Sequence, residues 1–121
     1  MAELYQKLVL QHYKQPLNKG EMKSGKVLKG ANYFCGDKLT LYLKVDKAGK
    51  ILDVKWQGGG CVIAQASASI FSEMIKGKNI KQVRKMPADD FLAALKITVS
   101  PARAKCALLP LYVIKEQKID D

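Results

Sequence analysis

The three cysteines of this 121-residue chain, Cys35, Cys61 and Cys106, suit sulfur and metal chemistry, and Asp37 lies two residues from the first of them. A thiolate is both a nucleophile and a metal ligand, and three thiolates with one carboxylate would complete a tetrahedral site. Soft sulfur ligands favour zinc or an iron–sulfur cluster. The spacing contains no C-x-x-C pair, however, and free cysteine is also common in hydrophobic cores. The residue types therefore leave both a metal site and three inert core thiols open.

Cys61 has the most informative surroundings of the three cysteines. It follows the glycines at 58–60, and a run of small residues typical of a closely packed helix comes after it. Consecutive glycines suit a backbone that turns with positive φ or passes close to another group. The dipole and the free N–H groups at the start of a helix favour a thiolate there. The Lys-Ser/Thr pair of a phosphate-binding P-loop is absent, so that reading of the glycines is set aside.

Two alternating segments predict an antiparallel hairpin. Residues 39–46 and 51–57 alternate apolar and polar side chains, and a glycine-containing turn at 47–50 joins them. A third, short strand is predicted at 26–29, ending at a glycine. The second strand of the hairpin is expected to place three apolar side chains on one face: Leu52, Val54 and Trp56. A hairpin is marginal alone, so helices must cover its apolar side.

The hairpin gives the candidate ligands a common location. Cys35 lies just before its first strand and Cys61 just after its second, so both are expected at the same end of the sheet. Asp37 follows Cys35 by two residues, and Gly36 would allow a tight turn between them. The chain order therefore predicts that two thiols and a carboxylate meet.

Helical patterns and capping residues predict five helices. The first spans residues 2–14, and the second spans about 61–76 with Gly77 as its C-cap. A short helix capped by Asn79, one that Pro87 opens and a last one that begins at Ser100 and Pro101 follow. Cys106 falls in the second turn of that last helix. Pro110 removes the hydrogen bond to the Cys106 carbonyl, so a kink or an early break is expected there. His12, the one histidine, lies on the apolar side of the first helix, which predicts a packed structural residue.

Composition bounds the class of protein. The length predicts one domain spanning 1–121, and the apolar content of 48% is ordinary for a soluble fold. Three cysteines, an odd number spread along the chain, fit a reduced cytoplasmic location better than a secreted disulfide framework. No stretch is long enough to cross a membrane.

The formal charge is +10, but 19 of the 21 basic residues are scattered lysines, so a solvated surface is preferred to a nucleic-acid-binding face.

The motifs around these residues resemble those of the iron–sulfur scaffold family that includes IscU, SufU and the N-terminal domain of NifU. The resemblance covers nearly the whole chain and is carried by five segments: His12-Tyr13 with Pro16, Asn18 and Gly20; the Cys-Gly-Asp motif within 32–39; the glycine and cysteine motif at 58–69; Lys76-Gly77-Lys78; and the Pro-Ala-Arg-Ala-Lys-Cys-Ala motif at 101–107.

The resemblance implies an α+β fold of the SufE/NifU-like type, in which a small antiparallel sheet of about three strands is covered on one face by helices. It also implies that Cys35, Asp37, Cys61 and Cys106 meet at one exposed end and bind zinc or hold a [2Fe–2S] cluster. A cysteine desulfurase of the SufS or IscS type would deliver sulfur, with Cys35 as first acceptor and Cys106 as second choice. Recipient apo-proteins would then receive the assembled cluster or the sulfur.

Two features distinguish the branches of this family. Lys105 precedes the third cysteine, as in the SufU branch, where IscU proteins have histidine; this makes Asp37 the expected fourth ligand. The interval from Cys61 to Cys106 is nevertheless too short for the SufU insertion. Three alternatives to a scaffold stay open: a zinc-dependent sulfurtransferase that holds no cluster, a structural zinc protein and, more remotely, a basic nucleic-acid-binding module.

Overall fold

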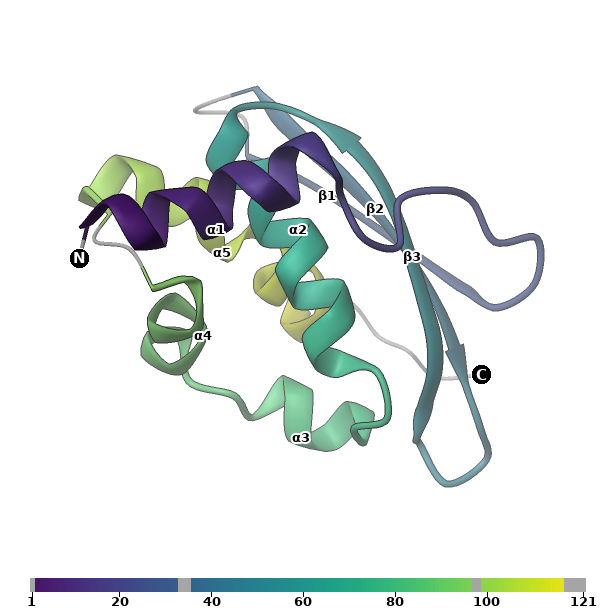
Figure 1. The fold of residues 1–121 in the computed structure, drawn as a ribbon. Coiled ribbons are helices and arrows are strands. Elements are labelled where there is room, and N and C mark those ends of the chain that lie inside the picture. The colour runs from purple at the N-terminus through teal and green to yellow at the C-terminus, as the bar shows by residue number, and fades with distance from the viewer. Residues whose placement is uncertain (1, 33–35, 97–98, 117–121) are drawn as a thin grey trace.

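A three-stranded antiparallel sheet carries the helices on one of its faces (Figure 1). The computed structural model describes residues 2–32, 36–96 and 99–116. The elements follow in the order α1 (Ala2–Lys14), β1 (Lys26–Asn32), β2 (Asp37–Val45), β3 (Ile51–Gly59), α2 (Val62–Ile75), α3 (Ile80–Arg84), α4 (Ala88–Leu95) and α5 (Pro101–Glu116). The strand order is β1-β2-β3, so the sheet is a simple meander. This confirms the predicted α+β architecture.

The alternation of side chains explains the sheet. In β2, Leu39, Leu41 and Leu43 point into the core, whereas Lys38 and Lys44 are exposed on the opposite face. This period of two is the pattern from which the hairpin was predicted. Strand β1 runs three residues further than the sequence predicted, because its pairing with β2 continues until Asn32 lies opposite Asp37.

One side chain in β3 lies on the opposite face from the one predicted. Val54 and Trp56 are buried as expected, but Leu52 is 49% exposed and Ile51 takes its place in the core. The cause is an irregularity in the register, where Lys44 pairs with Asp53 but the next residue of β2 pairs with Ile51. A bulge of this kind inserts one unpaired residue and reverses the alternation beyond it.

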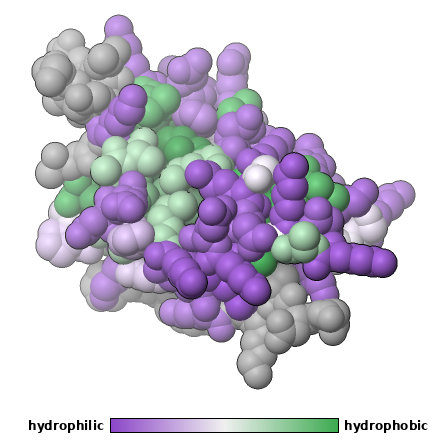
Figure 2. All heavy atoms as spheres, turned by 90° about the horizontal axis from the view of Figure 1, so that it is seen from below, coloured by the Kyte–Doolittle hydropathy of each residue, from purple (hydrophilic) through white to green (hydrophobic). Residues whose placement is uncertain are grey.

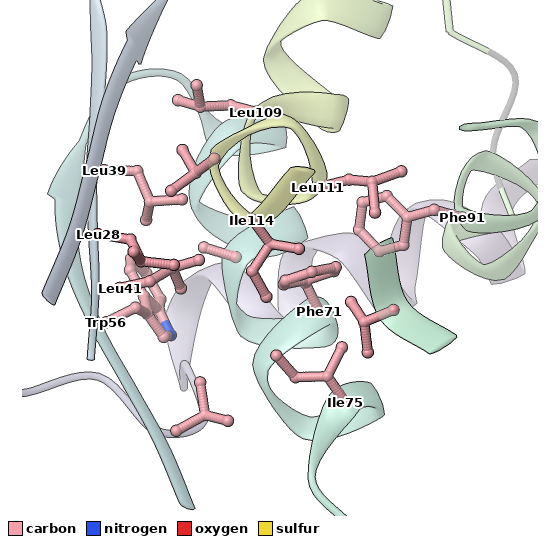
Figure 3. Close-up of a cluster of buried hydrophobic side chains, with 14 of the residues drawn as sticks. Leu28, Leu39, Leu41, Trp56, Phe71, Ile75, Phe91, Leu109, Leu111 and Ile114 are labelled. Atoms are coloured by element: carbon pink, nitrogen blue, oxygen red, sulfur yellow. The ribbon is translucent and has the colours of Figure 1, made fainter. Parts of the chain in front are cut away.

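The core lies between the sheet and two helices. Helix α2 packs on β3, α5 packs on β1 and β2, and α1 lies against α2. Figure 3 shows Leu41 and Trp56 of the sheet facing Phe71 of α2 and Ile114 of α5. Phe91 of α4 extends the cluster through an edge-to-face contact with Phe71, whose ring centroid lies 5.3 Å away. This packing fixes the two helices that carry the second and third cysteines.

Helix α5 runs unbroken through Pro110, so of the predicted kink or early break, the break does not occur. A proline inside a helix costs about 3 kcal/mol, mainly through the lost hydrogen bond and a steric clash. Its neighbours Leu109 and Leu111 are buried, as are Val113 and Ile114. Burial of a large apolar side chain contributes roughly 1.5–3 kcal/mol, so the packing of this face offsets the cost of the proline.

Two loops cover the outer edge of β3. The backbone of Trp56 donates to the Asn18 carbonyl at 3.0 Å and accepts from the Gly20 N–H at 2.8 Å. The indole Nε1 donates to the Leu17 carbonyl at 2.8 Å. Nearer the hairpin turn, the backbone of Ile51 pairs with the segment at 77–78 that follows α2. The exposed backbone groups of an edge strand are thereby satisfied within the molecule.

Hydrophilic side chains cover most of the face around α3 and the turn between β2 and β3 (Figure 2). In the described ranges, no helix combines the length and the apolar character needed to cross a bilayer.

The contact between α5 and β1 gives a test of this packing. A Cβ added at Gly30 would overlap the Val113 Cγ2 atom. We expect Gly30→Ala to lower the free energy of unfolding in urea by about 1–3 kcal/mol, and Val113→Ala in the same chain to recover part of that loss. Gly59→Ala is the control, because its added Cβ meets no atom within 4 Å. Equal stabilities of the Gly30 and Gly59 variants would contradict the packing.

Candidate metal centre

Asp37 and Cys61 meet at the end of the sheet, as the hairpin predicts. Gly36 has a φ of +73°, which turns the chain into β2. Lys38 then pairs with Gly59 at the end of β3. This register places the Cys61 N–H against the Asp37 carboxylate, and the N–H donates to Oδ1 at 3.1 Å.

The glycine run is explained by two close approaches. A Cβ at Gly58 would overlap the Lys38 carbonyl oxygen, and one at Gly60 would overlap Oδ1 of Asp37. Gly60 also has a φ of +134°, a conformation that other residues rarely adopt. The absence of side chains therefore allows the loop to lie directly on the carboxylate.

Cys61 caps the N-terminus of α2. Its backbone is extended, with φ −71° and ψ 169°, and its Sγ accepts a hydrogen bond from the Ala64 N–H at 3.4 Å. This N–H is one of the donors that a helix leaves without an internal partner in its first turn. The residue is half-buried, which makes it the more exposed of the two described cysteines.

Cys106 approaches from the opposite side, on the face of α5 that packs against the sheet. It is completely buried. The Asn32 amide Nδ2 lies 3.9 Å from its Sγ, and the Ala102 carbonyl lies one helical turn back at 4.0 Å. Because Asn32 pairs with Asp37 across β1 and β2, this contact brings Cys106 over the start of β2.

The three side chains form one cluster. One ligand atom from each of Asp37, Cys61 and Cys106 lies within 4.8 Å of the other two. With zinc–sulfur bonds of about 2.3 Å, two sulfurs of a tetrahedral site lie roughly 3.8 Å apart, so shifts of about 1 Å would close the cluster around an ion. Oδ2 of Asp37 is buried and has no hydrogen-bond partner among the described residues. A buried acceptor left in this way fits a bound cation.

One expected ligand lies outside the described residues, and the site is more buried than expected. Cys35 lies outside the described residues, so its place beside the cluster stays a prediction. The resemblance implied an exposed site, but Asp37 and Cys106 are both 0% exposed and Cys61 alone is half-buried. The packing of α5 against the sheet covers Cys106, and the Gly60 backbone covers the carboxylate.

His12 has the structural position predicted for it. Its Nδ1 lies 2.7 Å from Oγ of Ser69 on α2, and the same hydroxyl accepts the Leu17 N–H at 2.8 Å. The hydroxyl proton is thus available to an unprotonated Nδ1. Burial lowers the pKa of His12, opposed by the charge of Glu73, and so favours the neutral ring. In the described chain, His12 is not one of the clustered ligands.

Sequence reasoning missed two residues beside the cluster. One is Asn32, which contacts Cys106; the antiparallel register of β1 and β2 was needed to find it. The other is Gln65, whose side-chain Nε2 donates to the Gly60 carbonyl at 3.0 Å. Its position four residues after Cys61 on a helix was a usable signal, since residues at that spacing are neighbours.

Two curated proteins are similar to this chain over most of its length. The iron–sulfur cluster assembly enzyme IscU of Drosophila melanogaster is 35% identical over 97% of this chain and 77% of its own length. The zinc-dependent sulfurtransferase SufU of Bacillus subtilis is 36% identical over 88% of this chain and 83% of its own.

A solved structure and a family model complete the comparison. The N-terminal part of a nitrogen-fixing NifU-like protein from Brucella abortus superposes with a TM-score of 0.74 over 94% of this chain and 91% of its own. At 19% identity, that likeness concerns the fold alone. The model of the NifU-like N terminal domain matches residues 4–119. The chain therefore belongs to the family of NifU-like N-terminal domains.

Proposed function

We propose that this protein is an iron–sulfur cluster assembly scaffold that accepts sulfur from a cysteine desulfurase. The observation that carries the proposal is the cluster of Asp37, Cys61 and Cys106, with a buried carboxylate oxygen that lacks a partner among the described residues. The relatives named IscU and SufU support the same chemistry. We infer that residues 1–121 form one domain, which works in the cytoplasm.

Four residues would hold the metal or cluster: Cys35, Asp37, Cys61 and Cys106. A bound zinc ion or [2Fe–2S] cluster would keep the three sulfurs deprotonated. Asp37 supplies the hardest ligand of the four, which makes it the weakest partner for such a centre and the one that exchanges most easily. The hydrogen bond from the Cys61 N–H holds the Asp37 carboxylate in place when it does not coordinate the metal.

Sulfur acceptance follows ordinary thiol exchange chemistry. The acceptor thiolate attacks the outer sulfur of the desulfurase persulfide and forms a new S–S bond. The S–S bond of the donor breaks, and the desulfurase cysteine leaves as a thiolate with the electron pair. No net oxidation occurs. Burial of Cys106 argues against it as the first acceptor, and Cys35 is the acceptor proposed.

The positive charge of the protein favours partners with an acidic surface. A charge of +10 on scattered lysines would attract an acidic protein surface and speed encounter. A desulfurase of the SufS or IscS type and recipient apo-proteins are the partners proposed; no nucleic acid is required.

The proposal is tested on protein purified without oxygen. We expect tightly bound zinc or iron with sulfide, visible absorption after reconstitution with iron and sulfide, and faster desulfurase turnover when the chain is added. If the protein binds zinc and speeds desulfurase turnover but forms no coloured cluster, the scaffold function is rejected and the protein is a zinc-dependent sulfurtransferase. Nucleic-acid binding that survives replacement of all three cysteines by serine, with no effect on the desulfurase, would reject both.

The same assay identifies the acceptor. With isotopically labelled cysteine as substrate, mass spectrometry should find one added sulfur on Cys35 in the wild type and none on the Cys35→Ser variant. The Cys35→Ser variant should keep the thermal unfolding temperature of the metal-free wild type. A structural zinc site would instead make this variant unfold, and labelling of Cys106 in the wild type would reverse the assignment.

Gly60→Ala tests the contact between the glycine loop and the carboxylate. The new methyl group would displace Asp37, so we expect zinc affinity to fall by about tenfold or more, the range found when groups that orient ligands are altered. Gly59→Ala is the matched control, because its methyl group would meet open space. Competition with a chelating dye measures both affinities. Equal affinities would show that the position of Asp37 is unimportant.

A further inference from the structure

We propose that Gln65 is a positioning residue that selects which oxygen of Asp37 is free to coordinate a metal. The inference rests on the proposed function, since it assumes that Asp37 is a ligand. Gln65 acts through one peptide group, the one that joins Gly60 to Cys61. Its Nε2 donates to the carbonyl of that peptide at 3.0 Å, and the N–H of the same peptide donates to Oδ1 of Asp37 at 3.1 Å.

The orientation of the Gln65 amide is set from its other end. Lys19 Nζ donates to Oε1 of Gln65 at 3.4 Å, and the same ammonium lies 5.2 Å from the centre of the Trp56 ring. An ammonium can only donate, so it holds the amide with its oxygen toward Lys19 and its nitrogen toward Gly60. The donors then all point the same way, from the ammonium to the carboxylate, and hydrogen bonds in such a chain strengthen one another.

The loop needs this support because it is made of glycine. Gly60 has a φ of +134° and no side chain, so the backbone conformation alone does not prevent its peptide from rotating. Such a rotation would turn the Cys61 N–H away from Asp37. Gln65 holds the carbonyl side of the peptide and so fixes the N–H side as well.

The consequence concerns the two oxygens of Asp37. Oδ1 is occupied by the Cys61 N–H and covered by the Gly60 backbone, whereas Oδ2 has no partner among the described residues. The carboxylate is therefore presented to the sulfurs through a single oxygen. Without Gln65, Asp37 would be free to turn, and both its geometry and its strength as a ligand would change.

The experiment compares two equivalent substitutions. Gln65→Met keeps the length and the helix preference of the side chain but removes the amide. Gln57→Met makes the same change at a glutamine that contacts the Tyr42 hydroxyl at 3.1 Å and takes no part in this chain of hydrogen bonds. Zinc affinity, the visible spectrum of the cobalt-loaded protein and the thermal unfolding of the metal-free protein are measured for each.

We expect Gln65→Met to weaken zinc binding by about tenfold, as changes to groups that orient a ligand commonly do. The cobalt spectrum should shift because the oxygen ligand moves, while the unfolding temperature of the metal-free protein stays close to that of the wild type. Gln57→Met should leave all three unchanged. Lys19→Met should act in the same direction as Gln65→Met, but less, because it is one hydrogen bond further away.

The outcomes separate the two proposals. If the wild type binds neither zinc nor cobalt through its thiolates, the proposed function fails. If the wild type binds both and Gln65→Met has the same affinity and spectrum, the function stands and the role of Gln65 is refuted. Should Gln65→Met not fold, Gln65→Glu keeps the shape and lacks the donor, and it must show the same loss of affinity.

Discussion

A buried carboxylate, one oxygen of which has no partner among the described residues, is the constraint on which this end of the molecule depends. Asp37 is fully out of water, and of its two oxygens Oδ1 alone has a hydrogen bond within the described chain. An unsatisfied buried acceptor costs about 1–3 kcal/mol, and more if it is charged. A cation held between this oxygen and the sulfurs of Cys61 and Cys106 would remove that cost. Among the described residues, this cluster is therefore a candidate site for a metal ion.

A few local features of the fold place the other ligands around this carboxylate. The register of β2 and β3 brings the start of one strand beside the end of the other, and the glycines between β3 and α2 let the backbone lie against the carboxylate. Cys61 is the N-cap of helix α2, and α5 supplies Cys106 from its packed position on β1 and β2. The bulge and the covered edge of β3 shape the sheet without contributing a ligand. The buried face of α5 on both sides of Pro110 keeps the helix that supplies Cys106 continuous.

Much of this organisation could be predicted from the sequence, because it follows from local patterns. Strand alternation and capping residues gave the hairpin and the helix starts, and chain order placed Asp37 near Cys61. The exceptions depend on tertiary contacts. The exposure of Leu52 results from a shift in pairing between two strands, and the continuity of α5 at Pro110 results from burial on both sides of the proline. The helical spacing places Gln65 near Cys61, but the orientation of the Gly60–Cys61 peptide that it contacts depends on the Asp37 carboxylate and is not visible in the sequence.

The central claim is that three sulfurs and one carboxylate oxygen meet around one metal ion. X-ray absorption at the zinc edge of the zinc-loaded wild type tests it most directly, because it counts sulfur and lighter neighbours separately. The account predicts three sulfurs at about 2.3 Å and one oxygen at about 2.0–2.2 Å, with the oxygen lost or replaced by water in Asp37→Ala. Fewer than three sulfurs, or a nitrogen from His12 in place of the carboxylate, would contradict it.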